Sequence, residues 1–147
     1  MQNPPPARRP TRALQEFVQV SRAFEAHVAR ELTVNATDLA AMEHLISSGP
    51  LAPGELARRI GVTPPAVTAV VDRLEALGHA RREANPADRR SIVVTPSPGS
   101  VGQAMGILAP MIRDVDAALD GFDADEQEVI AQYLERVVAA YRAHVPA

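Results

Sequence analysis

The chain has 147 residues, enough for one sizeable hydrophobic core, and its net charge is -3. It contains no cysteine, so disulfides, thiolate nucleophiles and cysteine-ligated zinc are excluded. No apolar run approaches the roughly 20 residues that span a bilayer, and no signal-peptide core follows the N-terminus. These features predict a single cytoplasmic domain without a membrane segment.

The charge is unevenly distributed along the chain. Residues 58 to 90 hold seven arginines and four acids, a net charge of +3. Residues 91 to 147 hold three arginines and eight acids, a net charge of -5. A local basic surface can attract a polyanion even when the whole chain is acidic, because the local field governs steering. The distribution therefore indicates a basic surface on an acidic body.

Residues 1 to 60 carry a proline-rich lead-in and three helical patterns. Residues 1 to 10 hold four prolines and predict a disordered lead-in. From Thr11, apolar residues recur at steps of three and four as far as Leu32, which predicts a long helix. Thr37 is the expected cap of a second helix that ends in the segment SSGP. A short third helix is expected at about residues 53 to 60.

A fourth helix and a hairpin follow. Thr63 is a suitable N-cap and Pro64 a suitable first residue, because a proline there costs no intrahelical hydrogen bond. Gly78 is expected to end this helix. Its expected inward-facing residues are Val67, Val70, Val71, Leu74 and Leu77. Residues 79 to 95 contain two short runs around the turn-forming segment NPAD, which predicts a β-hairpin with a protruding tip.

Helical spacing returns after the hairpin. A heptad-like seam is formed by Val101, Met105, Leu108, Ile112, Val115 and Leu119. Pro110 lies inside this seam and is expected to kink or split the helix. The seam can pack within its own chain or against a partner helix, and we favour a core shared by both. Asp123 and Glu126 predict a capping box for a last helix, whose apolar stripe comprises Ile130, Leu134, Val137, Tyr141 and Val145.

The segment from residue 53 to 78 has the helix-turn-helix pattern, since the glycine-containing turn IGVT joins two short helices, and the hairpin extends it to a winged helix. The major groove of B-DNA admits one α-helix, whose first turns can reach base edges. Thr63, Ala66 and Thr68 are small residues that permit such an approach. They are therefore candidate contacts to the major groove.

The hairpin tip is the second candidate contact. Arg89 and Arg90 suit the minor groove, whose negative potential attracts arginine, and Asp88 is able to pair with one of them and fix its direction. Two amphipathic helices around a glycine also occur in unrelated bundles. The alternative is therefore a winged helix that serves as a protein-interaction module, with the two arginines at a solvated tip.

Residues 55 to 95, ELARRIGVTPPAVTAVVDRLEALGHARREANPADRRSIVVT, resemble the multiple-antibiotic-resistance (MarR) family of regulators, above all in VDRLEALG and NPADRR. The family's D-x-R element falls on Asp88 to Arg90, and the resemblance covers about residues 11 to 145. It implies a mainly α fold with a small β-hairpin wing. It also implies a homodimeric repressor, or less often an activator, that binds a pseudo-palindromic operator in double-stranded DNA. In this family a small lipophilic or phenolic effector often lowers the affinity for DNA.

The resemblance assigns roles to parts of the chain. Residues 37 to 96 would form the winged helix, and residues 11 to 34 and 97 to 145 the dimerisation helices. The implied DNA contacts are Thr63, Pro64, Ala66, Val67, Thr68, Arg73, Arg89 and Arg90, with Asp88 orienting Arg90. The implied dimer contacts include Leu14, Phe17, Val115, Leu119, Leu134, Val137 and Tyr141.

Some features depart from the family or exclude other functions. The family's wing usually ends in L-T-x-x-G, whereas Pro96 and Ser97 stand at those positions here, so strand pairing is expected to stop by Thr95. Aromatic residues make up only 3% of the chain, so no ring-stacking pocket is visible. The four histidines lack metal-ligand spacing, and no nucleophile or phosphate-loop motif is present. We therefore expect that the protein is not an enzyme and that it binds no metal or cofactor.

Overall fold

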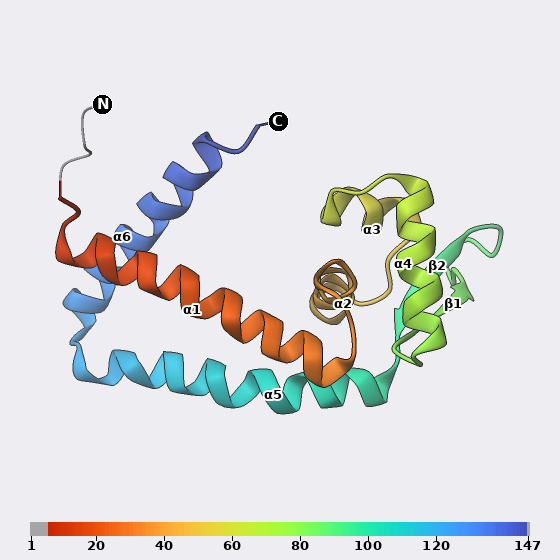
Figure 1. Cartoon of the computed structure of the whole chain (residues 1–147), viewed down its shortest axis with the longest axis horizontal. Coiled ribbons are helices and arrows are strands. Elements are labelled where there is room, and N and C mark those ends of the chain that lie inside the picture. Colours follow the sequence, from red (N-terminus) through yellow and green to blue (C-terminus); the bar gives the residue numbers. More distant parts are fainter. Residues whose placement is uncertain (1–5, 147) are drawn as a thin grey trace. The chain divides into compact units, whose positions relative to one another are not determined.

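The computed structural model describes residues 6–146, and the chain is mainly helical with one two-stranded sheet, as predicted (Figure 1). In order, its elements are α1 (Arg9–Leu32), α2 (Ala36–Ser48), α3 (Pro53–Ile60), α4 (Pro64–Ala76), β1 (Ala80–Ala84), β2 (Ile92–Pro96), α5 (Pro98–Ala117), the 3-10 turn η1 (Ala118–Gly121) and α6 (Ala124–Ala143). Two compact units divide inside α5, between Ile107 and Leu108. None of the helices described is long and apolar enough to cross a membrane.

α1 begins two residues earlier than predicted. Part of the predicted lead-in, residues 1–5, lies outside the described residues, but Arg9 and Pro10 already belong to the helix. Proline is well tolerated in a first turn because its missing N–H would have no intrahelical partner there. The four-proline composition therefore did not exclude a helix start.

Asn35, and not Thr37, caps α2, so that prediction is wrong. α1 ends with Thr33 in the left-handed conformation (φ 59°), and the Val34 N–H donates to the Ala29 carbonyl at 2.9 Å. This tight reversal places Asn35 in extended geometry, where its side-chain oxygen accepts from the Asp38 N–H at 2.8 Å. Asparagine is as good an N-cap as threonine, and it is the residue that the short turn puts in position.

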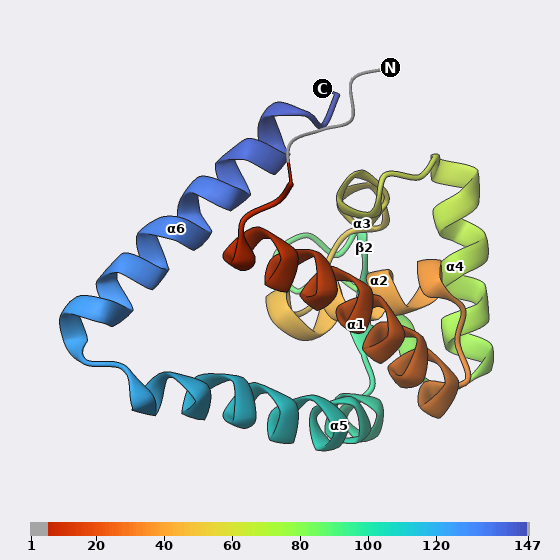
Figure 2. The ribbon, with the colours of Figure 1, turned by 60° about the vertical axis from the view of Figure 1, so that its left-hand side comes forward.

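The core of the first unit lies between α2 and the elements on its two sides. α2 contacts α1 on one side and α3, α4 and β2 on the other (Figure 1), and Figure 2 shows α3 nearly end-on beside α4. The largest fully buried apolar side chains are Leu32, Met42, Leu45, Leu56, Val70, Val71, Leu74 and Val94. Leu77, predicted to face inward, is 45% exposed, because α4 ends at Ala76 and Leu77 is its C-cap.

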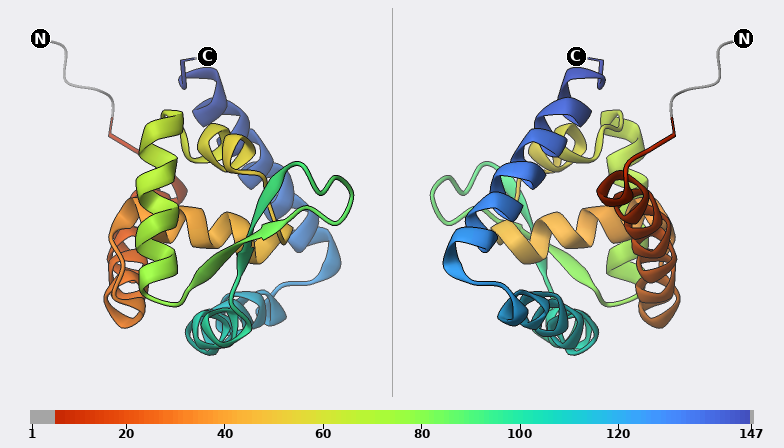
Figure 3. Two further views of the ribbon diagram at one scale, coloured as in Figure 1. Left: turned by 90° about the vertical axis from the view of Figure 1, so that its right-hand side faces the viewer. Right: turned by 90° about the vertical axis from the view of Figure 1, so that its left-hand side faces the viewer.

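The predicted hairpin is formed by β1 and β2, which pair antiparallel, and its tip extends beyond the neighbouring helices (Figure 3). The register continues to Ala80 opposite Pro96, one residue beyond the predicted stop at Thr95. The next ladder bond joins the Ser97 N–H to the His79 carbonyl at 2.8 Å. Pro96 therefore occupies a position that needs no donor toward β1, since antiparallel partners alternate between bonded and non-bonded pairs.

His79 joins three parts of the first unit. Its side chain is buried, with Nδ1 2.8 Å from the Ser100 hydroxyl and Nε2 2.7 Å from the Leu32 carbonyl. Nearby, the Gln103 amide donates to the Glu31 carbonyl at 3.2 Å. These contacts tie together the end of α1, the start of α5 and the base of the hairpin. Those of His79 are buried and therefore costly to leave unpaired, whereas the Gln103 bond is exposed.

The second unit contains the end of α5, η1 and α6. α5 continues through Pro110 and is not split there. The predicted capping box is present, since Asp123 and Glu126 exchange side-chain-to-backbone bonds, each of 2.9 Å. No residue of Ala124–Ala143 is buried, and its exposed apolar side chains include Val129, Leu134, Val138 and Tyr141. Such an apolar surface on a helix indicates a packing partner.

Candidate DNA-binding surface

The start of α4 is fixed by its own sequence. Thr63 is the N-cap, as predicted, and its hydroxyl accepts from the Ala66 N–H at 3.4 Å. Pro64 and Pro65 occupy the first two helical positions and have no N–H. A helix N-terminus usually offers several free backbone donors to an anion. At α4 those donors are absent or already engaged, so contacts there depend on side chains.

The outward surface of the first two turns of α4 is small and exposed. Thr63, Pro64 and Thr68 are exposed, as their predicted role requires, and Ala66 is half-buried. Pro65 and Ala69 are also exposed, and the helical repeat places Pro65 one turn before Thr68 and Ala69 one turn after Pro65. We call Thr63, Pro64, Pro65, Thr68 and Ala69 the recognition face.

Val67 does not belong to the recognition face. It is 2% exposed and packs in the core with the other inward residues of α4, so its assignment as a DNA contact is wrong. The helical repeat places Val67, Val70, Val71 and Leu74 on one side of the helix. A side chain on that side cannot reach a groove that lies against the opposite side.

Arg73 is engaged in a structural ion pair. Its Nε and Nη2 donate to the two carboxylate oxygens of Asp38 at 2.9 and 2.8 Å. The Asp38 carboxylate is 2% exposed and the Arg73 side chain 48%. The pair raises the pKa of Arg73 through the hydrogen bond to Asp38. Its charge is thus paired with that of a buried acid, and the pair joins α4 to α2.

Arg82 attaches the wing to α4. It forms ion pairs with Glu75 and with Asp72, whose Oδ1 lies 2.8 Å from Nη2. The same Nη2 is 3.5 Å from the Thr68 carbonyl. The backbone N–H of Arg82 also donates to Glu75 at 3.2 Å. These contacts fix the hairpin relative to the recognition face.

Other arginines near this surface have acidic partners too. Arg58 and Arg59 both bind Glu55 on α3, at 2.6 and 2.8 Å. Hydrogen bonds from Arg58 and then Arg59 lower the pKa of Glu55 to about 2. On the wing, Arg81 pairs with Glu83, whose second oxygen accepts from the Thr95 hydroxyl. These charges are partly compensated before any ligand arrives.

The wing tip, which we define as residues 85–91, carries uncompensated positive charge. Arg89 and Arg90 are exposed and make no ion pair with any residue that the structure describes. The Asp88 carboxylate accepts from the Arg90 backbone N–H at 3.1 Å. It therefore shapes the turn that presents Arg90, and it does so through the Arg90 backbone and not through the guanidinium group.

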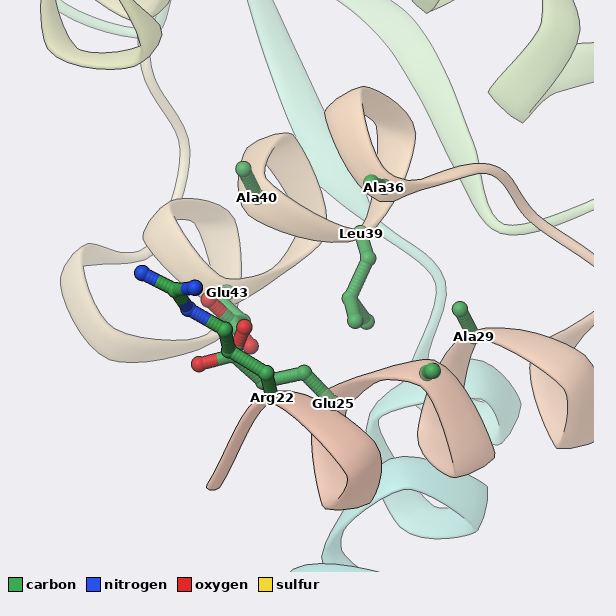
Figure 4. A pocket seen from close by; sticks show the side chains of 8 residues that line it. Arg22, Glu25, Ala29, Ala36, Leu39, Ala40 and Glu43 are labelled. Atoms are coloured by element: carbon green, nitrogen blue, oxygen red, sulfur yellow. The ribbon is translucent and has the colours of Figure 1, made fainter. Parts of the chain in front are cut away.

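A cleft of about 200 Å³ lies between α1 and α2 (Figure 4). Leu39 extends from α2 toward α1 at its floor, with alanines around it, and Arg22, Glu25 and Glu43 gather at one end. Burial and the nearby Glu25 charge raise the pKa of Glu43. No aromatic side chain lines the cleft. Within the described residues, no three His, Asp or Glu side chains come together as a metal-binding group.

The helix-turn-helix of α3 and α4, followed by the hairpin that Arg82 holds against α4, defines the class of winged-helix proteins. A family model described as "MarR family" matches residues 32–91. The HTH-type transcriptional regulator YcgE of Bacillus subtilis is 32% identical over 111 residues, which cover 76% of this chain and 72% of YcgE. The chain belongs to the MarR family of DNA-binding transcriptional regulators.

Solved structures of regulators have the same fold. A MarR-like transcriptional regulator of Thermotoga maritima superposes with a TM-score of 0.69 at 24% identity, covering 92% of this chain and 99% of that one. MarR of E. coli in its apo form gives a TM-score of 0.60 at 20% identity, with 90% and 98% covered. The regulator MhqR of B. subtilis is 25% identical over 132 residues, covering 86% of this chain and 91% of MhqR.

Proposed function

We propose that this regulator is a cytoplasmic homodimeric repressor that binds a pseudo-palindromic operator and leaves it when a small molecule binds. The observation that carries the DNA-binding part is the combination of the exposed recognition face with Arg89 and Arg90, which form no ion pair within residues 6–146. A helix of this kind fits the major groove, and the wing tip would reach the adjacent minor groove, where arginine is attracted.

Exposed apolar side chains support the dimer. Phe17 on α1 is 61% exposed, Val115 on α5 59% and Tyr141 on α6 59%. Leu14, Leu119, Leu134 and Val137 are the other proposed contacts, and each is at least partly exposed. Two copies that bury these side chains against each other would remove apolar area from water. A dimer would also present two recognition faces to two operator half-sites.

The α1–α2 cleft supports release by an effector. Its volume is close to that of apolar cavities that hold a single aromatic ring, and its floor of Leu39 and alanines suits a lipophilic compound. The cleft lies between α1, which carries proposed dimer contacts, and α2, which packs against α4. A ligand that separates α1 from α2 would therefore change the position of the recognition faces relative to the dimer.

A salt titration with matched arginine variants tests the DNA contact. We would select a duplex from random sequences and measure its binding to the full chain by fluorescence anisotropy. The salt concentration would be varied between about 50 and 200 mM. Arg90→Ala should weaken binding and reduce the salt slope by about one unit. Arg58→Ala serves as control, because Glu55 already binds that guanidinium.

Two results would count against the proposal. An unchanged salt slope for Arg90→Ala would remove the wing tip from the contact surface. Absence of salt-dependent duplex binding by the wild-type chain would favour the alternative, a winged helix that binds protein. A panel of phenolic and lipophilic compounds in the same assay tests release, since an effector should weaken duplex binding.

A further inference from the structure

The recognition face lacks the side chains that usually specify bases. Thr63, Pro64, Pro65, Thr68 and Ala69 include no arginine, lysine, asparagine or glutamine. Bidentate hydrogen bonds from those four residue types distinguish guanine and adenine in the major groove. The first two turns of α4 therefore cannot recognise a base by a pair of hydrogen bonds from one side chain.

The few polar groups on this face are mostly engaged within the helix. The Thr68 hydroxyl donates to the Pro64 carbonyl at 3.2 Å, and the Thr63 hydroxyl accepts from the Ala66 N–H. Pro64 and Pro65 have no N–H to offer. What remains is the rings of both prolines and the methyl groups of Thr68 and Ala69, which together form an apolar surface.

We propose that the recognition face recognises thymine through its C5-methyl group. Thymine is the base that presents a methyl group in the major groove, and apolar side chains are suited to contact it. The inference rests on the proposed binding of an operator. It assigns specificity in each half-site to apolar contacts from Pro65, Thr68 and Ala69, and it separates this function from the arginines of the wing tip.

Replacing thymine by deoxyuridine tests the proposal, because uracil lacks the methyl group and keeps every hydrogen-bonding atom. The full chain would be used to select a duplex from random sequences, and thymines in one half-site would be replaced one at a time. Replacing a contacted thymine should lower the affinity of the duplex about fourfold, the factor expected for burial of one methyl group. Replacing the symmetric pair should cost roughly fifteenfold. Thymines outside the footprint are the control.

Two variants of Thr68 distinguish contact from structure. Thr68→Ser removes the methyl group and keeps the hydroxyl that binds the Pro64 carbonyl. Thr68→Val keeps the methyl and removes the hydroxyl. At the one position that Thr68 contacts, Thr68→Ser should bind the thymine duplex and the uracil duplex with equal affinity. Thr68→Val should keep the roughly fourfold preference for thymine. A variant that only perturbs the helix would weaken both duplexes by the same factor.

The outcomes separate this inference from the proposed function. If the wild-type chain binds the selected duplex specifically but tolerates every uracil within twofold, the methyl contact is overturned and operator binding stands. A thymine preference that Thr68→Ser leaves intact would exclude Thr68 as the contact. If the chain prefers no duplex over random competitor DNA, operator binding fails and the inference fails with it.

Discussion

Replacing Arg73 by alanine should destabilise the fold far more than replacing an exposed arginine. The change leaves the Asp38 carboxylate, which is 2% exposed, without its partner. Removal of one member of a buried pair typically costs about 3–5 kcal/mol. Arg73 is itself 48% exposed, and Asp38 lies in the first turn of α2, where the helix dipole offsets part of the loss. We therefore expect Arg73→Ala to lower the free energy of unfolding by about 2–4 kcal/mol.

Urea denaturation followed by circular dichroism measures this cost directly. The midpoint should fall without a change in slope, and the melting temperature should drop by roughly 5–15 °C for a chain of this size. Arg58→Ala is the matched control, because Arg58 is 73% exposed and its pair with Glu55 is an i,i+3 surface pair. That control should leave the midpoint almost unchanged, because exposed ion pairs contribute little to stability.

The result has a second part that concerns DNA. Because Asp38 already binds the Arg73 guanidinium, Arg73→Ala should leave the salt slope of duplex binding unchanged, in contrast to Arg90→Ala. The reasoning is refuted if Arg73→Ala costs less than about 1 kcal/mol at an unchanged denaturant slope. It is also refuted if the variant lowers the salt slope by a full unit, since Arg73 would then contact phosphate.

Three further changes have defined outcomes. His79→Ala should lower the free energy of unfolding by about 2–4 kcal/mol in urea, because the Leu32 carbonyl and Ser100 hydroxyl lose their buried partner; a loss below about 0.5 kcal/mol would contradict this. Glu25→Gln should lower the pKa of Glu43 in an NMR titration, since Glu25 helps to raise it; no change would exclude that repulsion. A raised carboxyl pKa means that the folded state binds the proton more tightly than the unfolded state does. The free energy of unfolding therefore falls as pH rises from the ordinary pKa of Glu43 through the raised one, and it should fall less steeply in Glu25→Gln. Leu134→Asp should give a monomer in sedimentation analysis, whereas Arg136→Asp, on another side of α6, should leave the protein dimeric. If both variants remain dimeric, Leu134 does not belong to the interface.

Local signals in the sequence were enough to predict several element boundaries. α3 spans Pro53–Ile60 as predicted, and Gly61 adopts the left-handed conformation (φ 69°) that ends it. The cap at Thr63 and the capping box of α6 were also found. Each of these depends on residues within four positions of one another, where side-chain and backbone groups meet whatever the rest of the chain does.

The contacts that organise the site are long-range, and local patterns do not predict them. Asp38 and Arg73 are 35 positions apart, and His79 and Leu32 are 47 apart. Nothing within a few residues of Arg73 distinguishes a structural arginine from a DNA contact. Val67 is a different case, because the helical repeat already placed it inward while the family resemblance placed it on the groove. The repeat was correct, since burial follows from helix geometry.

The ion pairs locate the free charge of the basic segment. Five of its seven arginines bind acids at Asp38, Glu55, Asp72, Glu75 and Glu83, which leaves Arg89 and Arg90 without ion pairs among the described residues. Attraction to phosphate is then concentrated at the wing tip, whereas the recognition face is apolar. Salt screens the first contribution and has little effect on the second. Raising the salt concentration should therefore weaken binding to the selected duplex and to random DNA alike, while the preference for thymine over uracil stays constant. A preference that declines in parallel with affinity would mean that charged groups, and not methyl contacts, distinguish the bases.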